Sequence, residues 1–363
     1  MRIAVLAHLH HPIAEPFSGG TEMHTSLVVD ELVRRGHEVT LFAKGGSRTS
    51  GRLVPLVGDD FVFGQMPGPG GDRSGVILDV AVRSALAAIR QDRYDVVLNN
   101  SFSALPYTEL AAQPMITILH TPPTLEKVLA VITDPAWAPD PVHAFVSVSE
   151  VNSASWRRLL AGVRCIPNGI RLDGWSDASR AEPDLAVWAG RITPEKGLHL
   201  AIDAVRATDL RLEISGPIAD RTYFDTEIVP RLGDRVTHVG HLAHDELARQ
   251  LGRGAVFVSS SVWAEPFGLT LVEAMSCGTP VAAFATGAAA EIVTPAAGVL
   301  ARAETPEALA VAIEEARHAD RGAVRRRAED FDAQIMVDRY EELLREVVDR
   351  RRVAVPVAGG ARE

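Results

Sequence analysis

Short runs of β-branched and apolar residues alternate along this chain with longer segments in which apolar residues recur every three to four positions. In the first half, the runs that predict strands are residues 3–7, 39–43, 95–99, 115–119, 144–148 and 164–166. Residues 22–35 and 79–90 have the helical spacing, and Gly36 follows the first of them as a typical stop. Strands that alternate with helices in this way indicate a parallel sheet covered by helices.

A polar stretch, residues 170–183, interrupts this alternation, which then resumes. The second series of predicted strands covers residues 185–189, 211–215, 236–239, 255–259 and 281–284. From Pro306 to about Asp349 the pattern is helical, and the proline suits a first helical position.

We therefore predict an α/β protein with two doubly wound, Rossmann-like domains that face each other across a cleft, followed by C-terminal helices. The N-terminal domain would cover residues 1–169 and the C-terminal domain residues 184–340, joined by a linker at 170–183. A helix end and tail at 341–363 could pack back toward the N-terminal domain. Ligands of such sheets bind beyond the carboxyl ends of the strands, which places the expected site in the cleft.

Composition narrows the class of protein. The chain has 363 residues, of which 47% are hydrophobic and 23% charged, and its net charge is −10. These values exclude a disordered tail, a coiled coil and a collagen-like repeat, and the acidic balance argues against nucleic acid as a partner. The first apolar run ends at His8 and no run of 18 apolar residues follows, so we expect neither a signal peptide nor integral membrane association. Only two cysteines occur, Cys165 and Cys277, which excludes a disulfide framework and is typical of a cytoplasmic protein. The sequence does not indicate the oligomeric state.

The segment from Ser259 to Pro280 carries the strongest candidate site. A helix is expected to begin at about Pro266, so that its first free N–H groups point toward the cleft and can bind phosphate or sugar oxygens. These N–H groups belong to Phe267, Gly268 and Leu269. Glu265 precedes the helix and Glu273 lies inside it, about 12 Å further along the axis, which suits opposite ends of one extended ligand. The alternative is a capping carboxylate with a surface glutamate.

A second candidate site follows the predicted strand at residues 185–189. Arg191 at the strand end and Lys196 five residues later can converge on a diphosphate, and Gly190 and Gly197 permit close approach of the backbone. Only three of the 37 basic residues are lysines, which adds weight to Lys196. The alternative is a solvated helix start.

The N-terminal domain offers weaker signals. Gly19 and Gly20 precede a helix and form an anion-receptive turn, although the dinucleotide fingerprint G-x-G-x-x-G is absent. His120 ends the predicted strand at residues 115–119, where a functional and a structural histidine fit equally well. Near the end of the first strand, three histidines lack the cysteine or acidic partners of a metal site, and we predict no metal there: His8, His10 and His11.

Taken together, these segments resemble the family 4 retaining glycosyltransferases of the GT-B fold, in the right order over roughly residues 1–300. The most specific motif is E-x7-E, from Glu265 to Glu273, within E-P-F-G-L-x-x-x-E-A-M-x-x-G-x-P. The other motifs are Gly19-Gly20-Thr-Glu, Leu119-His120-Thr, Val146-Ser-Val-Ser149-Glu, Ile166-Pro-Asn-Gly-Ile170, and Gly190-Arg191 with Glu195-Lys196-Gly197.

The resemblance implies a retaining transferase of the hexosyltransferase type. It would require no cofactor and no metal, and would use a UDP-, GDP- or dTDP-sugar as co-substrate. The acceptor would be a hydroxyl group of a small metabolite, a natural-product aglycone or a glycan. Transfer would be a front-face substitution in which the departing phosphate helps to deprotonate the acceptor hydroxyl, and the protein supplies charge and positioning.

The resemblance also assigns roles to the candidate residues. Arg191 and Lys196 would neutralise the donor diphosphate, and the Gly19–Gly20 pair would close over its distal phosphate from the other domain. Glu273 would accept hydrogen bonds from the ribose. The transferred sugar would be held by Glu265 and the amides of residues 267–269, with His120 beside its anomeric centre.

One departure from the family pattern concerns the transferred sugar. Ala288 stands where the family often has the second glycine of a Gly-Gly pair, which would make the sugar pocket tighter. The acceptor is expected at the loops 59–75 and 121–143. Two alternatives from other classes are a non-catalytic nucleotide-sugar-binding protein and an NAD-dependent oxidoreductase with two Rossmann-like domains. The intact glutamates and cations argue against the first, and the missing fingerprint argues against the second.

Overall fold

The computed structural model describes residues 1–63, 73–175 and 181–354. The linker predicted at 170–183, the loop 59–75 and the tail 341–363 therefore fall partly outside the described residues. The chain divides into two compact units, which are described separately. Unit 1 comprises Met1–Val148, Ser153–Ile166 and Met336–Glu363, and unit 2 comprises Ser149–Asn152 and Pro167–Ile335.

Unit 1 is built on a seven-stranded sheet in the order β3-β2-β1-β4-β5-β6-β7, with every neighbouring pair parallel. Its strands are β1 (Arg2–Ala7), β2 (Glu38–Lys44), β3 (Arg52–Val57), β4 (Val96–Asn100), β5 (Met115–Leu119), β6 (His143–Ser147) and β7 (Arg164–Cys165). Its helices are α1 (Gly20–Arg34), α2 (Ser74–Asp92), α3 (Leu105–Glu109), α4 (Glu126–Ile132) and α5 (Glu150–Trp156), which begins in unit 2.

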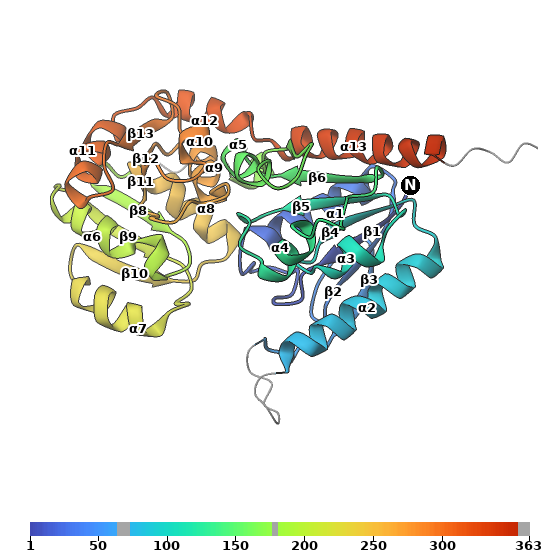
Figure 1. Cartoon of the computed structure of the whole chain (residues 1–363). Helices are drawn as coiled ribbons and strands as arrows, with labels where there is room; N and C mark the ends of the chain where they lie inside the picture. The colour runs from blue at the N-terminus through green and yellow to red at the C-terminus, as the bar shows by residue number, and fades with distance from the viewer. Residues whose placement is uncertain (64–72, 176–180, 355–363) are drawn as a thin grey trace, which may run out of the picture. The chain divides into compact units, whose positions relative to one another are not determined.

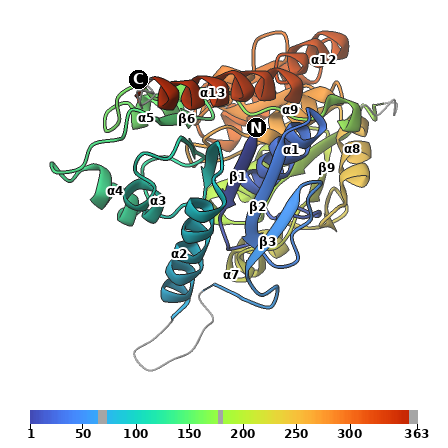
Figure 2. The ribbon, with the colours of Figure 1, turned by 90° about the vertical axis from the view of Figure 1, so that its right-hand side faces the viewer.

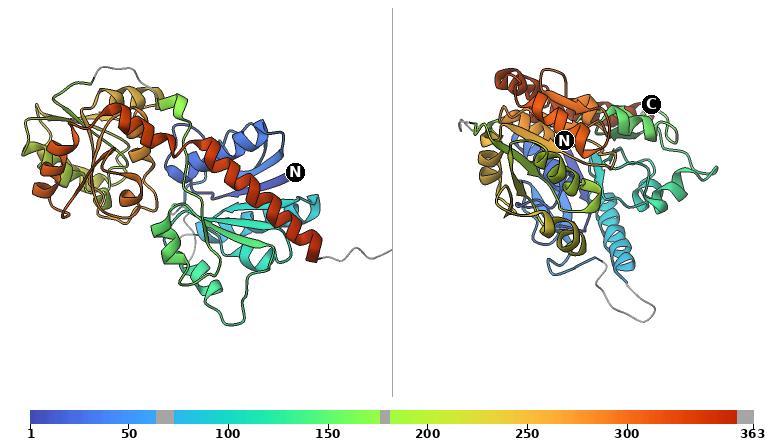
Figure 3. Two further views of the ribbon diagram at one scale, coloured as in Figure 1. Left: turned by 90° about the horizontal axis from the view of Figure 1, so that it is seen from above. Right: turned by 90° about the vertical axis from the view of Figure 1, so that its left-hand side faces the viewer.

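Helices cover both faces of this sheet. On one face, α2 packs with Leu86 and Ile89 against Leu6 and Val97 of the strands. The other face carries α1 and most of α13 (Ala333–Ala354), which lies above the strands in Figure 1 and crosses them in Figure 3. Figure 2 shows α1 and α2 on either side of β1 to β3. Such double coverage explains why the central strands are apolar without alternation.

The C-terminal helix is held to unit 1 by a buried ring and by ion pairs. Tyr340 is fully buried. Glu341 accepts hydrogen bonds from Arg35 at 2.9 Å and from Nε2 of His37 at 3.1 Å. Glu346 pairs with Arg164 at 2.6 Å. Residues 336–347 therefore contribute buried side chains to the core of unit 1.

Unit 2 has a six-stranded parallel sheet in the order β10-β9-β8-β11-β12-β13. Its strands are β8 (Leu185–Ala189), β9 (Arg211–Ser215), β10 (Val236–Gly240), β11 (Val256–Ser259), β12 (Val281–Phe284) and β13 (Gly298–Ala301). Its helices are α6 (Leu198–Arg206), α7 (Arg221–Tyr223), α8 (His244–Arg253), α9 (Leu269–Ser276), α10 (Ala289–Ile292), α11 (Pro306–Ala316) and α12 (Arg321–Glu329). Short 3-10 turns lie at η1 (Leu172–Trp175), η2 (Pro194–Lys196) and η4 (Val229–Arg231), and a π-turn lies at η3 (Phe224–Ile228).

The predicted α/β class with two doubly wound parallel sheets is confirmed. All eleven predicted strands are present, but β3 and β13 were missed, and both are edge strands. Pro55 interrupts the pattern of β3, and it is tolerated because an edge strand can lose one ladder hydrogen bond. Among the described residues, no helix is both long enough and apolar enough to cross a bilayer.

Candidate functional site

In unit 2, three neighbouring strands end at glycines. Gly190 follows β8, Gly216 follows β9, and Gly240 ends β10. Gly216 has φ 138°, and a Cβ atom there would lie 1.8 Å from the carbonyl oxygen of Gly190. Its N–H donates to the carbonyl of Gly240 at 2.8 Å. These strand ends therefore pack backbone against backbone, which only glycine permits at residue 216. Sequence reasoning missed Gly216, since no motif marks it.

The loop that carries the two candidate cations is fixed to the neighbouring strand end. The hydroxyl of Ser260 donates to the carbonyl of Lys196 at 3.0 Å, and that of Ser261 donates to the carbonyl of Glu195 at 3.2 Å. Gly197 has φ 62°, and a Cβ atom there would lie 2.2 Å from the carbonyl oxygen of Ser260. Only glycine therefore permits this contact, and the contact sets the height of Lys196 above the sheet.

The two cations differ in their surroundings. Arg191 is exposed and makes no hydrogen bond or ion pair with any residue of the described parts of the chain. Lys196 is ion-paired with Glu265. About a fifth of each of these two side chains is exposed, 23% for Lys196 and 21% for Glu265. The sequence predicted both residues as site residues but did not predict that they contact each other.

Helix α9 begins later than predicted. Its first residue is Leu269 and its N-cap is Gly268, which has φ 95°, so Pro266 lies outside the helix. The N–H groups of Phe267, Gly268 and Leu269 have no backbone acceptor among the described residues. They are therefore available to bind an anion, as the first N–H groups of a helix are in general. The side chain of Phe267 is 4% exposed and packs edge-on against Phe331, so it belongs to the core.

The 12 Å separation predicted for Glu265 and Glu273 assumes a helix from about Pro266, and that helix start is wrong, because only the part from Leu269 onward is helical. Glu265 is instead placed by a turn that precedes α10. Gly287 has φ 54°, and a Cβ atom there would lie 2.3 Å from the backbone of Glu265. Ala288, the departure from the family pattern, donates its N–H to the carbonyl of Glu265 at 3.0 Å and is fully buried. Its methyl group consequently packs in the core.

Glu273 is a buried carboxylate in the second turn of α9. Its side chain is 5% exposed and has no hydrogen-bond partner among the described residues. Burial raises its pKa to about 8. The group is therefore mostly protonated at pH 7, and once ionised it binds a pair of hydroxyl donors strongly, since they restore the solvation that folding removed.

In unit 1, a histidine and a glutamate pair beside the glycine turn. Gly20 is the first residue of α1 and Gly19 is its N-cap. Glu22 lies in the first turn, where one carboxylate oxygen is 3.3 Å from Nε2 of His8 and the other is 3.2 Å from where a Cβ atom of Gly19 would stand. Both His8 and Glu22 are buried. The hydrogen bond from His8 lowers the pKa of Glu22 against the effect of burial.

His120 follows β5 and is buried. Its Nε2 donates to Oδ1 of Asn100, the last residue of β4, at 3.2 Å. Asn100 is fixed in turn by a bond to the hydroxyl of Thr25 at 3.1 Å. The His24 ring lies edge-on to His120 at a centroid distance of 4.8 Å. Burial lowers the pKa of His120 well below its usual value, so the ring is neutral at pH 7.

His10 and His11 lie near His8, and the ring centroids of His8 and His10 are 5.7 Å apart. The ring of His10 leans on Phe63 at 4.6 Å. His11 is exposed. Within the described ranges, no group of three or more histidines, cysteines or carboxylates is placed to ligate a metal ion.

Comparison with known proteins identifies the family. The sequence model of the glycosyl transferases group 1 matches residues 173–330, and that of glycosyltransferase family 4 matches residues 18–173. The chain is a family 4 glycosyltransferase. A similar relative is the D-inositol 3-phosphate glycosyltransferase of Mycolicibacterium smegmatis, which is 26% identical over 331 residues that cover 79% of this chain and 76% of the relative.

Solved structures of other glycosyltransferases have the same fold. Sucrose-phosphate synthase from Thermosynechococcus elongatus has a TM-score of 0.76 and 22% identity, over 96% of this chain and 99% of the other. HepE from Anabaena in complex with UDP-glucose has a TM-score of 0.72 and 20% identity, over 95% of this chain and 100% of the other. The predicted GT-B class of this glycosyltransferase is thereby confirmed.

Several contacts that shape the site were not predicted. Asn100 and Gly216 contact predicted residues on other elements. Glu22 belongs to the Gly19-Gly20-Thr-Glu motif, but it pairs with His8, which follows β1, so no local spacing could reveal these contacts. The double asparagine that ends β4 was the one available signal, because polar residues rarely end a buried strand without a partner.

Proposed function

We propose that this glycosyltransferase moves a sugar from a nucleoside diphosphate sugar to an acceptor hydroxyl with retention at the anomeric carbon and without a metal ion. The observation that carries the proposal is the buried and unpartnered carboxylate of Glu273, which follows a helix start with free N–H groups. A ribose with two vicinal hydroxyls fits this carboxylate.

The diphosphate is bound by Arg191 and Lys196. The Arg191 guanidinium is exposed and can donate to two phosphate oxygens at once. Lys196 is held on a loop whose backbone is fixed by Ser260, and its ammonium pairs with Glu265. These two cations carry the charge that a metal ion carries in other sugar transferases. The related HepE structure contains UDP-glucose, which supports a diphosphate donor of this kind.

The transferred sugar is bound by Glu265 and the amides of residues 267–269, while Gly19, Gly20 and His120 of unit 1 contribute at the distal phosphate and the anomeric carbon. The neutral ring of His120 suits a positioning role, since it is not protonated and does not act as a general acid at pH 7. Its bond to Asn100 fixes which nitrogen carries the proton.

In the proposed step, the bond from the anomeric carbon to the diphosphate oxygen breaks and a bond from the acceptor oxygen forms on the same face. The acceptor proton passes to the departing phosphate oxygen, and the products are the glycoside and the nucleoside diphosphate. Arg191 and Lys196 stabilise the negative charge that develops on the leaving group.

Both cysteines are thiols, which supports a reducing cytoplasmic setting.

Thermal denaturation with UDP, GDP, dTDP and NAD tests the donor. At about 100 times its dissociation constant, the correct diphosphate stabilises the wild type by roughly 2.7 kcal/mol. The Glu273→Ala variant should show much less stabilisation by the same nucleotide. Stabilisation by NAD alone would refute the proposal. With the donor identified, NMR of the glycoside tests retention, and transfer in the presence of EDTA tests metal independence.

A further inference from the structure

His24 is a buried histidine in the second turn of α1 to which the proposed mechanism gives no role. It is 1% exposed, and neither of its ring nitrogens has a hydrogen-bond partner among the described residues. Burial lowers its pKa to about 3, so the ring is neutral at pH 7. A neutral imidazole carries one N–H donor and one acceptor nitrogen, and burying both without partners destabilises the fold.

Packing alone does not explain a histidine at this position. A leucine fills nearly the same volume and brings no polar atom into the core, so it would be the more stable residue here. A buried polar group without a partner therefore requires another reason, and a role in activity is one that recurs in proteins. The contacts of the His24 ring indicate such a role.

The ring of His24 contacts the ring of His120. Their centroids are 4.8 Å apart and their planes are inclined by 76°, which is an edge-on arrangement. Rings attract each other in this geometry, because the positive edge of one faces the negative face of the other. His24 therefore restricts how the ring of His120 can turn.

A third ring supports His24 in its turn. Tyr340 of α13 lies edge-on to His24, at a centroid distance of 5.6 Å and an angle of 73°. Tyr340 is itself fully buried, and its hydroxyl has no partner within the described parts of the chain. Tyr340, His24 and His120 thus form a continuous row of rings inside unit 1, which runs from the C-terminal helix to the end of β5.

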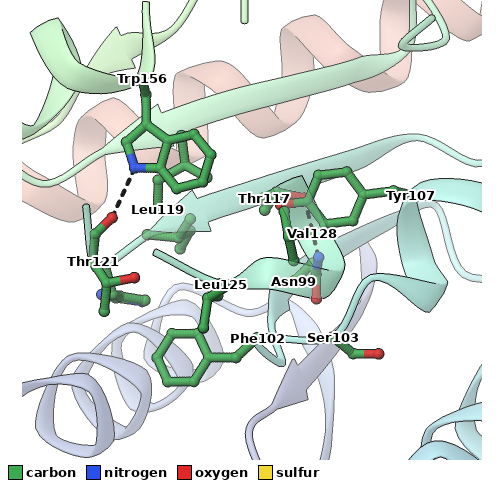
Figure 4. Close-up of a pocket in the computed structure, with 12 residues that line it drawn as sticks. Asn99, Phe102, Ser103, Tyr107, Thr117, Leu119, Thr121, Leu125, Val128 and Trp156 are labelled. Atoms are coloured by element: carbon green, nitrogen blue, oxygen red, sulfur yellow. Dashed lines mark hydrogen bonds between the residues drawn. The ribbon is translucent and has the colours of Figure 1, made fainter. Parts of the chain in front are cut away.

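His120 needs this support because it borders a cavity. The cavity is small and lies at the carboxyl ends of β4 and β5, where Phe102, Leu119 and Thr121 also line it (Figure 4). The Phe102 ring meets His120 at 84° but at a centroid distance of 6.4 Å, which is further away than His24. A side chain beside a cavity has room to change rotamer, so the closer ring has the larger effect on its orientation.

Helix α1 holds His120 through two successive residues. The hydroxyl of Thr25 accepts from the Asn100 amide at 3.1 Å and donates to the carbonyl of Thr21 at 2.7 Å. Asn100 in turn accepts from Nε2 of His120. Thr25 thus fixes one nitrogen of the imidazole through Asn100, and His24 fixes the plane of the ring. Both supports belong to the helix that begins at the predicted phosphate turn.

We propose that His24 is a positioning residue for sugar transfer, which holds the ring of His120 in one orientation with Tyr340 behind it. The inference rests on the proposed function, in which His120 lies at the anomeric carbon. His24 itself contacts no substrate, because its side chain is buried in unit 1. Through Tyr340, the C-terminal helix α13 contributes to the same orientation.

The test compares three variants of the whole protein. His24→Leu removes the aromatic edge at about equal volume, and His24→Phe restores an edge without the nitrogens. Val29→Ala is the matched control, because Val29 is fully buried on the same helix and its truncation destabilises α1 without removing a ring.

Three measurements are made on each variant. NMR of protein labelled with ¹⁵N in the histidine rings reports the two ring nitrogens of His120, whose signals are assigned from their loss in His120→Gln. Release of the nucleoside diphosphate from the donor, with water as the acceptor, gives kcat and KM. Thermal melting gives the stability.

We expect one pair of His120 signals, with the proton on Nε2, in the wild type and in Val29→Ala. In His24→Leu this pair should split or broaden, and kcat should fall about tenfold at unchanged donor KM, while the melting temperature stays equal or rises. His24→Phe should recover the single pair of signals and most of kcat. If His24→Phe does not fold, the comparison of His24→Leu with Val29→Ala decides.

An unchanged His120 spectrum or an unchanged kcat in His24→Leu would overturn the inference and leave the proposed function standing. A fall in kcat that Val29→Ala shares would also overturn it, because the loss would then follow from stability alone. If no nucleoside diphosphate binds the wild type, the proposed function fails, and the inference fails with it.

Discussion

The ammonium group of Lys196 is ion-paired with the carboxylate of Glu265, which lies 69 residues further along the chain. Each group is only partly exposed, so each offsets the charge that the other would otherwise present to solvent. A diphosphate that approaches Lys196 must share this ammonium with Glu265. The pair therefore couples the residue proposed for the phosphate to the residue proposed for the sugar.

Replacing Lys196 by alanine should weaken UDP or GDP binding. The variant loses a charge-assisted hydrogen bond, which is worth about 1.5–3 kcal/mol, or roughly ten- to a hundredfold in affinity. Titration calorimetry measures this change. Lys127→Ala is the matched control, because Lys127 is also paired with a carboxylate, Asp79, but on the exposed surface of unit 1. Equal affinities in the two variants would remove Lys196 from the phosphate site.

Replacing Glu265 by glutamine should reduce turnover without weakening the binding of the nucleoside diphosphate. The substitution removes the competing charge from Lys196, so nucleoside diphosphate affinity should stay equal or rise. Turnover should fall by about a hundredfold, because a positioning contact to the sugar is lost. Initial rates and diphosphate titrations on the same preparation separate the two effects. A fall in affinity at unchanged turnover would contradict the role at the sugar.

Glu273 should give both binding and stability a pH dependence. Its pKa of about 8 means that the carboxylate becomes ionised, and able to accept both ribose hydroxyls, as the pH rises through 8. Diphosphate affinity should therefore increase from pH 6.5 to 9 in the wild type and stay flat in Glu273→Gln. Parallel pH profiles in the two proteins would exclude this role.

The stability of the fold should change with pH in the opposite direction to diphosphate affinity. Folding raises the pKa of Glu273 from 4.5, so the folded protein holds this proton more tightly than the unfolded chain does. Raising the pH from 4.5 to about 8 consequently favours unfolding. The melting temperature of Glu273→Gln should exceed that of the wild type by a margin that grows over this pH range.

Gly216→Ala should destabilise unit 2. The new Cβ atom would lie 1.8 Å from the carbonyl oxygen of Gly190, so the strand ends must separate. We expect the free energy of unfolding to fall by about 2 kcal/mol and diphosphate binding to weaken with it. Gly233→Ala is the control, because a Cβ atom there meets nothing within 4 Å. Denaturant titration of both variants measures the difference, and equal stability would show that the backbone contact is not tight.

Asn100 should act on turnover through His120. Asn100→Ala removes the acceptor at 3.2 Å from Nε2, and turnover should fall about ten- to a hundredfold with diphosphate affinity unchanged. Asn100→Asp keeps an acceptor oxygen but adds a negative charge, which raises the pKa of His120. Its turnover should therefore gain a dependence on pH near neutrality that the wild type lacks. A wild-type profile in Asn100→Asp would argue that the contact only stabilises the fold.

The sequence predicts the strands of both sheets well because parallel strands covered on both faces are apolar runs. It fails at β3, where Pro55 breaks the run, and at the start of α9, where Pro266 suits a first helical position but Gly268 at positive φ begins the helix instead. The motifs predict Arg191, Lys196 and Glu265 as site residues in the segments that follow predicted strands, and Glu273 from its spacing to Glu265. The pairing of Lys196 with Glu265 depends on which strands are neighbours, and the local pattern does not contain that information.

Most of helix α13 belongs to unit 1 although it follows unit 2 in the sequence, so a single cut in the chain cannot separate the two units. Cutting the polypeptide once, after residue 169, would release a first half without Met336 and the residues that follow it. Arg35 and His37 would lose Glu341, and the site that buries Tyr340 would open to water. The first half of the chain is therefore not an autonomous folding unit when it leaves the ribosome. Unit 1 cannot complete its core until the last helix has been synthesised, after unit 2 has emerged.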